Sequence, residues 1–397
     1  MGGDSGLRVA PAVESALWAA AERIAGRASL DRRALEAAIA ARSQRYTSER
    51  ERLAQPIAAG RRAADLAARS VFFSVCDAPK PRVPIFELAG QRALPGRRPL
   101  RILDLGAGCG AMTLGVLDAL IAAGAASPSG SAPWAEILAV DRDGDALAVA
   151  TEAMREAPWR ALARFETERA DVTQGAWRGE RFDLVVAGSL VNELADADAA
   201  AVVRRALSAL ADDGAVIVIE PALRETSRAL HRLRDAAITE GAHVFAPCTR
   251  RDTPCPALDD ARDWCHEDRP VRLPPRARAL ADATGLREHG AKFSYLVLRS
   301  RERALVEVAP GERALRVVSR PRKLKGVSEC FVCGAEGRTR LRRLRRERSP
   351  ENRALDRVRR GDVLVVPDEV EREGAVCANH ALARKQPALS PPDDEHG

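Results

Sequence analysis

The chain has 397 residues, of which 46% are hydrophobic, 4% aromatic and 30% charged, and its formal net charge is +7. This length predicts two or three domains, and the composition excludes a disordered chain, a collagen-like repeat and a disulfide-dominated miniprotein. No apolar run reaches the roughly 18–20 residues that a membrane helix needs, and the N-terminal segment lacks the basic start and apolar stretch of a signal peptide. We therefore expect a cytoplasmic protein with no membrane partner.

The positive charge is concentrated in one segment. Residues 301–360 contain 19 Lys and Arg against 8 Asp and Glu, an excess of +11, so the rest of the chain sums to −4. Only five of the 63 basic residues are lysines, and this arginine bias is typical of a GC-rich genome. The concentration of positive charge in one segment is nevertheless what a phosphate-binding surface requires. The segment is therefore a candidate phosphate-binding surface.

The first part of the chain, residues 1–97, reads as helical. Apolar residues recur at helical spacing through residues 14–26 and 30–46, and Asp31 or Ser48 is a candidate for capping a helix start. A proline-rich stretch at residues 77–84 ends the periodic pattern. These features predict an N-terminal helical region.

Residues 98–300 alternate apolar strand-like runs with helical ones. The strand-like runs begin with LRILDL at residue 100 and continue at residues 136–141, 181–189 and 214–220, and each precedes a helical pattern. Such alternation indicates βαβ units and a parallel, doubly wound α/β sheet. A last strand is expected at residues 292–300, after a helix.

Two segments interrupt or follow this alternation. Residues 241–275 are rich in Pro, Asp and Arg and contain three cysteines, so we interpret them as an insertion into the sheet domain. From residue 301 to 378, short β-like runs at 304–309, 314–319 and 362–367 predict a small basic β domain, a candidate oligonucleotide-binding-type barrel. Residues 379–397 are expected to form a disordered tail.

A glycine loop follows the first predicted strand. Asp104 ends the strand, and Gly106, Gly108 and Gly110 come before the next helix. Glycines suit a tight turn in which the backbone approaches a ligand. The spacing also satisfies a dinucleotide-binding pattern through Ala111. However, an acidic residue directly ahead of the glycines suits the ammonium group of S-adenosylmethionine better than a pyrophosphate.

Two further acids follow the next strands. Asp141 ends the second strand, where an acid can accept hydrogen bonds from both ribose hydroxyls. Asp171 follows a third strand, expected between the runs at 136–141 and 181–189, near the expected adenine position; the run at 181–189 is then the fourth strand. Together with Asp104 and the glycines they predict S-adenosylmethionine binding, with an eroded pocket as the alternative. In this prediction the cofactor-binding residues are Asp104, Gly106, Gly108, Gly110, Asp141 and Asp171.

The segment after the fourth strand, SLVNEL at residues 189–194, assigns no catalytic residue. It lacks the Asn-Pro-Pro-aromatic motif of amino-methyltransferases, and it contains no cysteine for a covalent route to a pyrimidine C5. Asn192 and Glu193 are candidates for orienting a substrate or, equally, for capping the next helix. Direct methyl transfer mostly needs positioning, so the absence of a catalytic motif does not exclude an enzyme.

The cysteines permit two metal sites. In one, Cys330, Cys333, Cys377 and His380 form a zinc site, since C-x2-C with C-x2-H is a common zinc spacing. In the other, Cys248, Cys255 and Cys265 recruit one cysteine of the C-terminal domain to hold an iron–sulfur cluster. Spacing alone favours zinc slightly.

Several motifs together resemble a known family. They are LDLGAGCG (103–110), DLVVAGSLVNEL (183–194), IVIEP (217–221), APCTRRDTPCP (246–256), DWCH (263–266), KFSYLVL (292–298) and RPRKLKGVSECFVC (320–333). Over residues 98–365 the chain resembles the methyltransferase-like family associated with the mitochondrial small ribosomal subunit and its bacterial relatives. The cysteine-bearing motifs between strand five and KFSYLVL are absent from ordinary methyltransferases and make this resemblance specific.

The resemblance implies a class I S-adenosylmethionine-dependent methyltransferase fold and a [4Fe-4S] cluster. The implied ligands are Cys248, Cys255, Cys265 and Cys333, the last preferred to Cys330. It also implies a ribosome-associated protein that methylates small-subunit rRNA or acts as a non-catalytic assembly factor, so that we expect RNA, and not DNA, as the partner. The chain departs from the family in the segment after Glu220 and in having Cys377-x2-His380, which leaves zinc open. A small-molecule methyltransferase with structural zinc is the alternative function.

Overall fold

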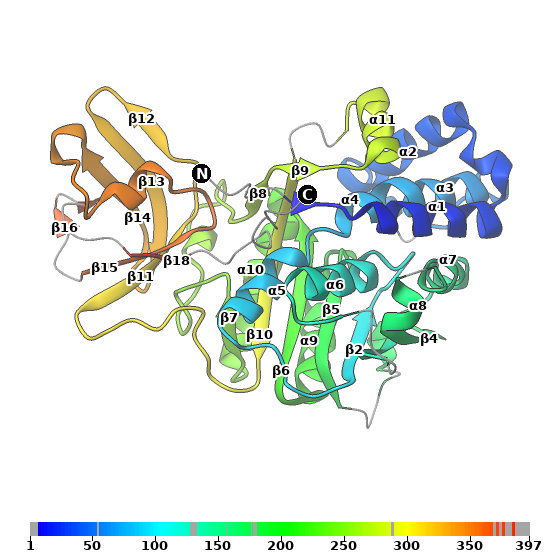
Figure 1. The fold of residues 1–397 in the computed structure, drawn as a ribbon, viewed down its shortest axis with the longest axis horizontal. Helices are drawn as coiled ribbons and strands as arrows, with labels where there is room; N and C mark the ends of the chain where they lie inside the picture. Colours follow the sequence, from blue (N-terminus) through cyan, green and yellow to red (C-terminus); the bar gives the residue numbers. More distant parts are fainter. Residues whose placement is uncertain are drawn as a thin grey trace.

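The computed structural model describes most of the chain. The described residues are 7–53, 55–127, 133–156, 158–175, 177, 181–286 and 290–367, and the backbone is also described at 371–372, 375–377 and 383–385. N-terminal helices lie at one end of the long axis, a large sheet lies in the middle, and a smaller, curved C-terminal sheet, which we call the barrel, lies at the other end (Figure 1). His380 and most of the predicted tail fall outside the described residues.

The N-terminal region is helical, as predicted. Its elements are α1 (Pro11–Ala25), α2 (Arg32–Thr47), α3 (Arg62–Ala68), a π-helical turn η4 (Arg69–Ser74), α4 (Val75–Asp77) and α5 (Arg82–Gly90). The Asp31 side chain caps α2 by accepting hydrogen bonds from two backbone amides, whereas Ser48 follows the end of that helix and does not start another. Capping by Asp31 satisfies amides that a helix start leaves unpaired.

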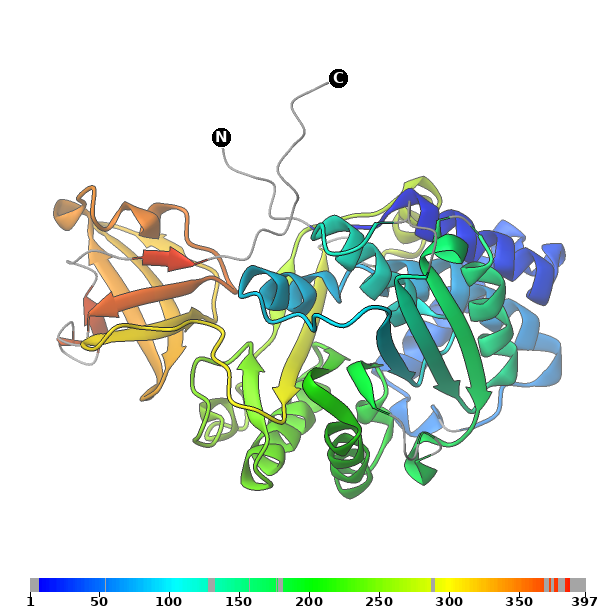
Figure 2. The same ribbon diagram turned by 60° about the horizontal axis from the view of Figure 1, so that its bottom comes forward.

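The central sheet is mixed. Its strands are β2 (Leu100–Leu105), β3 (Ala135–Asp141), β4 (Ala163–Arg169), β5 (Phe182–Gly188), β6 (Leu210–Pro221), β7 (His243–Ala246), β8 (Glu267–Arg269) and β10 (Ala291–Arg299). The spatial order is β4-β3-β2-β5-β6-β10-β7, and β8 pairs with β10 (Figure 2). Strands β2 to β6 are parallel, and β10 is antiparallel to β6 and β7.

This order identifies the fold. The parallel strands follow the 3-2-1-4-5 order of a doubly wound sheet, and the antiparallel β10 enters between β6 and β7. Such an antiparallel strand distinguishes class I methyltransferases from dinucleotide-binding folds, so the predicted Rossmann-like class I fold is confirmed. Residues 243–246, which the sequence places inside the insertion, form the edge strand β7.

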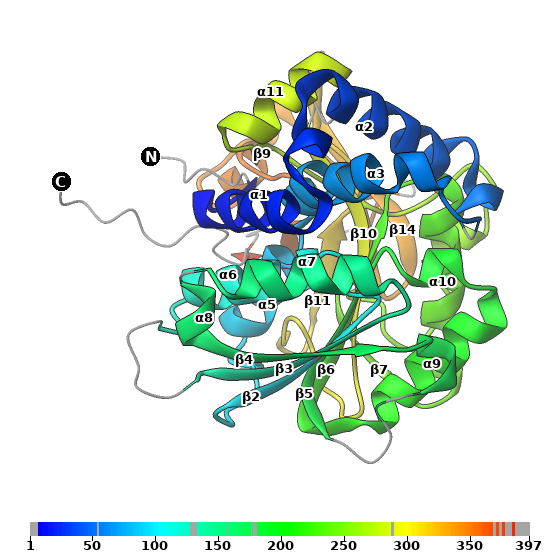
Figure 3. The same cartoon turned by 90° about the vertical axis from the view of Figure 1, so that its right-hand side faces the viewer.

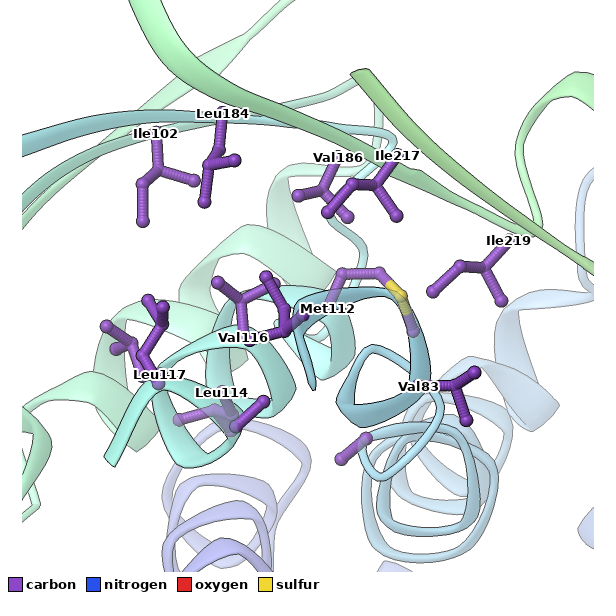
Figure 4. Packing of buried hydrophobic residues seen from close by; sticks show 14 of the residues in the cluster. Val83, Ile102, Met112, Leu114, Val116, Leu117, Leu184, Val186, Ile217 and Ile219 are labelled. Atoms are coloured by element: carbon purple, nitrogen blue, oxygen red, sulfur yellow. The ribbon is translucent and has the colours of Figure 1, made fainter. Parts of the chain in front are cut away.

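Helices cover both faces of the sheet. They are α6 (Ala111–Ala122), α7 (Gly144–Met154), α8 (Trp159–Leu162), α9 (Asp196–Ser208) and α10 (Arg224–Thr239), whereas α11 (Pro275–Thr284) packs against α2 (Figure 3). Alternating strand side chains enter two separate cores, one with α5, α6 and α7 and the other with α9 and α10. Figure 4 shows the first core, where Val186 and Ile217 face Met112 of α6 and Ile219 lies near Val83 of α5. Of the helices in the described part of the chain, none is both long and apolar enough to cross a membrane.

The C-terminal strands form a second sheet with its own small core. They are β11 (Glu312–Val317), β12 (Arg322–Leu324), β13 (Val327–Gly334), β14 (Gly337–Leu344), β15 (Val363–Pro367), β16 (Glu371–Arg372), β17 (Ala375–Cys377) and β18 (Ala383–Lys385). Their order is β16-β17-β14-β13-β11-β15-β18, with β12 paired to β13. The expected β run at 304–309 is not a strand; its Leu305 and Val306 pack against the core of the central sheet instead.

Candidate functional site

The glycine loop connects β2 to α6 in a conformation that requires glycine. Gly106, Gly108 and Gly110 have φ angles of +68°, +52° and +86°. Residues with a Cβ rarely adopt such left-handed angles, which explains the three glycines of the motif. The loop thereby turns the chain from the end of β2 directly into the start of α6.

Asp104 lies beneath this loop and is almost wholly buried, with 1% of its surface exposed. Its Oδ2 accepts hydrogen bonds from the backbone N–H of Thr113 at 3.0 Å and from the Thr113 hydroxyl at 2.7 Å. Its Oδ1 is buried without a hydrogen-bond partner among the described residues. Desolvation raises the pKa of Asp104 to about 7. A buried, half-satisfied carboxylate is costly unless a ligand supplies a donor or a positive charge.

Asp141, at the end of β3, holds the loop from the neighbouring strand. Its Oδ2 accepts a hydrogen bond from Gly108 N–H at 2.8 Å, and its Oδ1 accepts one from Asp143 N–H at 2.8 Å. A carboxylate has about four lone-pair positions, so these two bonds leave acceptor capacity for a ligand. Asp141 thus anchors the glycine loop, and its contact with ribose hydroxyls stays a prediction.

Asp171 is exposed and has a local structural role. It caps the short turn η5 (Val172–Gln174), where its Oδ1 accepts hydrogen bonds from the N–H and hydroxyl of Thr173 at 2.8 and 2.7 Å. These hydrogen bonds lower the pKa of Asp171. Its contact with an adenine remains a prediction.

The N-terminal region covers the glycine loop, which the sequence did not reveal. Arg69, in η4, forms an ion pair with Asp143, and its Nη2 lies 3.8 Å from where a Cβ on Gly108 would be. From the other side, Leu190 Cδ1 would lie 2.9 Å from a Cβ on Gly106. No periodicity or motif marks these contacts, because each joins segments that are far apart in the chain.

Asn192 and Glu193 do not cap the following helix. The helix α9 begins at Asp196, and its N-cap residue is Ala195. Asn192 instead donates its amide to Glu220 and accepts a hydrogen bond from Arg50 at 2.6 Å. Glu220, at the end of β6, is 1% exposed, and desolvation raises its pKa to about 8. This Asn–Glu pair lies at the same carboxyl edge of the sheet as the acids at the ends of β2 and β3.

The second candidate site is a cavity of about 60 Å³ between the insertion and the barrel. Cys248, Cys255 and Cys265 of the insertion line it together with Cys333 of β13. The contacts between the two parts are direct: the Thr249 hydroxyl donates to the Cys333 carbonyl at 3.0 Å. We call this feature the cysteine cavity. The cysteines expected to hold a cluster thus share one site.

Cys330 lies away from the cysteine cavity. It is buried in the barrel core with Val332 and Leu341. Because β13 is a continuous strand, residues three apart point to opposite faces, so Cys330 and Cys333 cannot bind one zinc ion as expected for a C-x2-C pair. Of the other two zinc candidates, His380 lies outside the described residues, and of Cys377 only the backbone is described. The geometry therefore disfavours the zinc site.

The side chains lining the cysteine cavity limit which metal groups it could hold. Among the residues described, no three His, Cys, Asp or Glu side chains converge closely enough to hold one metal ion. A cubane cluster presents iron atoms at its corners, so its cysteine ligands surround a volume rather than a point. Two guanidinium groups, from Arg234 and Arg338, also line the cavity and would balance the negative charge of thiolate ligands.

Burial keeps these thiols protonated in the absence of metal. Desolvation raises the pKa of Cys255 and Cys333 to about 12 and that of Cys265 to about 11. Metal binding would therefore release protons from them.

Comparison with known proteins assigns the family. Residues 87–364 match the family described as mitochondrial small ribosomal subunit Rsm22. The chain belongs to the Rsm22 family. The match includes the glycine loop, the insertion and β11 to β14 of the barrel. The resemblance read from the sequence is thereby confirmed. It links this chain to a family associated with the small ribosomal subunit.

Solved structures similar to this Rsm22-family chain are methyltransferases, but the likeness is distant. The plantazolicin methyltransferase BpumL in complex with SAH is 11% identical, with a TM-score of 0.37, and the match covers 68% of this chain and 98% of that one. Magnesium protoporphyrin IX methyltransferase from Synechocystis with bound SAM is 13% identical, with a TM-score of 0.34 and the same coverage. The search of curated proteins returned no match. The fold assignment accordingly rests on the strand order.

Proposed function

We propose that this Rsm22-family chain binds S-adenosylmethionine at the glycine loop and acts on small-subunit rRNA, as a methyltransferase or as an assembly factor. The observation that carries this proposal is the unpaired Oδ1 of Asp104, buried directly below the loop and without a partner among the described residues. An ammonium group of a bound ligand would satisfy it. A pyrophosphate at this position would instead be repelled by the carboxylate.

The acids of the neighbouring strand support the same ligand. Asp141 already orients the loop through Gly108 and retains lone pairs for ribose hydroxyls. Arg69, held near Gly108 by Asp143, is a candidate partner for the ligand's carboxylate. Each charged group of the amino acid moiety would thus find an opposite charge in this chain.

Methyl transfer needs little from the protein besides positioning. S-adenosylmethionine supplies an electrophilic methyl carbon: its bond to sulfur breaks as the substrate nucleophile attacks, and the electron pair remains on sulfur. The Asn192 amide, held between Glu220 and Arg50, is at the correct edge of the sheet to position a substrate. No residue is assigned as a base.

An iron–sulfur cluster in the cysteine cavity is the second part of the proposal. The four thiols belong to two parts of the chain, so the cluster would cross-link the insertion to the barrel. Polar contacts already join the insertion to the barrel. Arg338 of β14 forms an ion pair with Asp263, and Arg360 donates a hydrogen bond to the His266 carbonyl at 2.9 Å. The cluster would thereby hold the basic barrel at a fixed orientation toward the methyltransferase fold.

Calorimetric titration with S-adenosylmethionine tests the ligand. We expect the wild type to bind, and Asp141→Ala to lose measurable affinity because both the loop anchor and the ribose acceptor disappear. Asp198→Ala, which replaces an exposed acid on α9, is the control and should bind as the wild type does. Tighter binding of a nicotinamide dinucleotide than of S-adenosylmethionine would overturn the proposal.

A further inference from the structure

The outer face of the strands β12, β13 and β14 carries an exposed aromatic residue. Cys330, Val332 and Leu341 point into the barrel core, and strand alternation therefore turns Phe331 outward. Phe331 is 41% exposed, although large apolar side chains in this chain are otherwise mostly buried. The register places Arg340 directly opposite Phe331. We call this surface the hairpin face; its outward residues are Arg322, Leu324, Glu329, Phe331, Arg340 and Arg342.

Arg340 and Phe331 form a cation–π contact. The guanidinium carbon of Arg340 lies 5.8 Å from the centre of the Phe331 ring. Leu324, which is 48% exposed, lies on the same face, because β12 and β13 pair with Leu324 opposite Val327. Aromatic rings and arginine planes displayed side by side on a sheet are the surface on which single-stranded nucleic acids stack their bases.

The charge of the hairpin face fits a polyanion. Arg322 and Arg340 are exposed, and within the described part of the chain neither has an ion pair. The same holds for Lys323 and Lys325 beside them. The acid on this face, Glu329, lies 3.9 Å from Arg342, which offsets its charge. Unpaired cations at the edge of an exposed ring favour RNA over an uncharged protein partner.

The pairing of the strands points to the same use. Strands β11, β13 and β14 form a consecutive antiparallel series, β11 also pairs with β15, and β14 pairs in parallel with β17. This is the Greek-key pattern of an oligonucleotide-binding barrel, in which the face of the second and third strands binds the oligonucleotide. Here those two strands are β13 and β14, which carry Phe331 and Arg340.

We propose that the hairpin face is a single-stranded RNA subsite, in which one base stacks on Phe331 and the flanking phosphates lie along Arg322 and Arg340. The proposal rests on RNA being the partner of this chain and adds where and how it binds. Phe331 and Cys333 are two residues apart on one face of β13, about 7 Å along the strand, so RNA at this subsite would lie beside the cysteine cavity.

Fluorescence anisotropy of the full chain with a labelled oligouridylate of about 12 nucleotides, within the span of one such barrel, tests this proposal. We expect Phe331→Ala to weaken binding by about 5- to 150-fold, the loss typical of one stacked base. Phe331→Trp should retain binding. Val308→Ala, which removes another exposed apolar side chain away from this face, is the matched control and should have no effect.

An abasic oligomer of the same length separates stacking from charge. Phe331→Ala should leave its affinity unchanged, whereas Arg322→Gln should weaken both oligomers equally. Equal thermal unfolding temperatures of Phe331→Ala and the wild type would show that the variant keeps its fold. If Phe331→Ala does not fold, Leu324→Ala removes the neighbouring exposed side chain of the same face and can be compared with the wild type on both oligomers.

Three results would overturn the proposal. Undiminished RNA binding by Phe331→Ala would exclude the stacking subsite while leaving RNA binding itself intact. Phe331-dependent binding of polyglutamate in place of RNA would assign the face to an acidic protein partner. Absence of any RNA binding by the wild type would instead refute the proposed function as a whole.

Discussion

The guanidinium of Arg316 lies 2.6 Å from the carboxylate of Glu87, although 229 residues separate them in the chain. Arg316 belongs to β11 of the barrel and Glu87 to α5 of the N-terminal region. Arg316 also contacts Glu267 at 2.8 Å and the Tyr295 hydroxyl at 2.9 Å, and all four side chains are buried. One hydrogen-bonded network thus joins the three parts of the molecule beside the cysteine cavity.

Replacing Arg316 should destabilise the protein strongly. Arg316→Met would leave the buried Glu87 without its cation and Glu267 with only Arg269, and breaking a buried pair typically costs about 3–5 kcal/mol. Urea unfolding measures the loss. The control Arg301→Met removes one partner of the exposed pair Arg301–Asp212, and we expect a cost of less than about 1 kcal/mol. Equal effects of the two substitutions would show that the buried network contributes nothing beyond a surface pair.

We expect the metal content of the protein to depend on the four thiols that line the cysteine cavity. Anaerobically purified protein should contain iron and acid-labile sulfide in equal amounts, and Cys255→Ser should lose both because one cluster ligand is gone. Cys330→Ala should keep the cluster, since that thiol points into the barrel core. Elemental analysis with visible absorption spectra reports the outcome. Stoichiometric zinc without iron would contradict the cluster.

Glu220 should make stability fall with rising pH. Its pKa in the folded protein is about 8, against an ordinary value of 4.5, so the folded state holds a proton that the unfolded state has released across this window. Its stabilising contribution is complete below pH 4.5 and is lost as the pH rises through about 8. Urea unfolding from pH 5 to 9 should show a smaller fall for Glu220→Gln than for the wild type. Asp198→Asn, at an exposed position, should follow the wild-type curve; parallel curves for all three proteins would contradict the prediction.

The arginines of residues 338–349 should not contribute equally to RNA binding. Arg343 is buried against Asn352 and Asp356, and Arg338 pairs with Asp263. Arg345 and Arg346 are exposed, without an ion pair to another described residue. Replacing both by Gln should reduce the slope of log affinity against log salt by about 0.7 for each RNA phosphate that an arginine no longer neutralises.

The matched control for this experiment is Arg348→Gln. Arg348 lies in the same segment but is already paired with Asp356 at 2.9 Å, so its replacement should change the slope little. Binding isotherms at several salt concentrations measure both variants. A larger change for Arg348→Gln than for the double variant would refute the assignment of Arg345 and Arg346 as the RNA-binding cations.

The sequence by itself determined the features that are local. Glycines at positions 106, 108 and 110 specify left-handed backbone, and apolar runs that alternate with helical patterns specify parallel strands. Asp31 was identifiable as a helix cap because capping involves only the next few residues. Each of these local features depends only on residues close together in the chain, so the types of those residues are enough to predict it.

Only the tertiary structure decided which distant groups meet. Cys333 rather than Cys330 joins the insertion's cysteines because strand alternation and barrel docking turn it toward them. Arg69 covers the glycine loop, and Arg316 reaches Glu87, although no spacing in the sequence encodes either approach. Likewise, the number of basic residues could not separate buried structural arginines from exposed ones, because burial follows from packing between segments and not from composition.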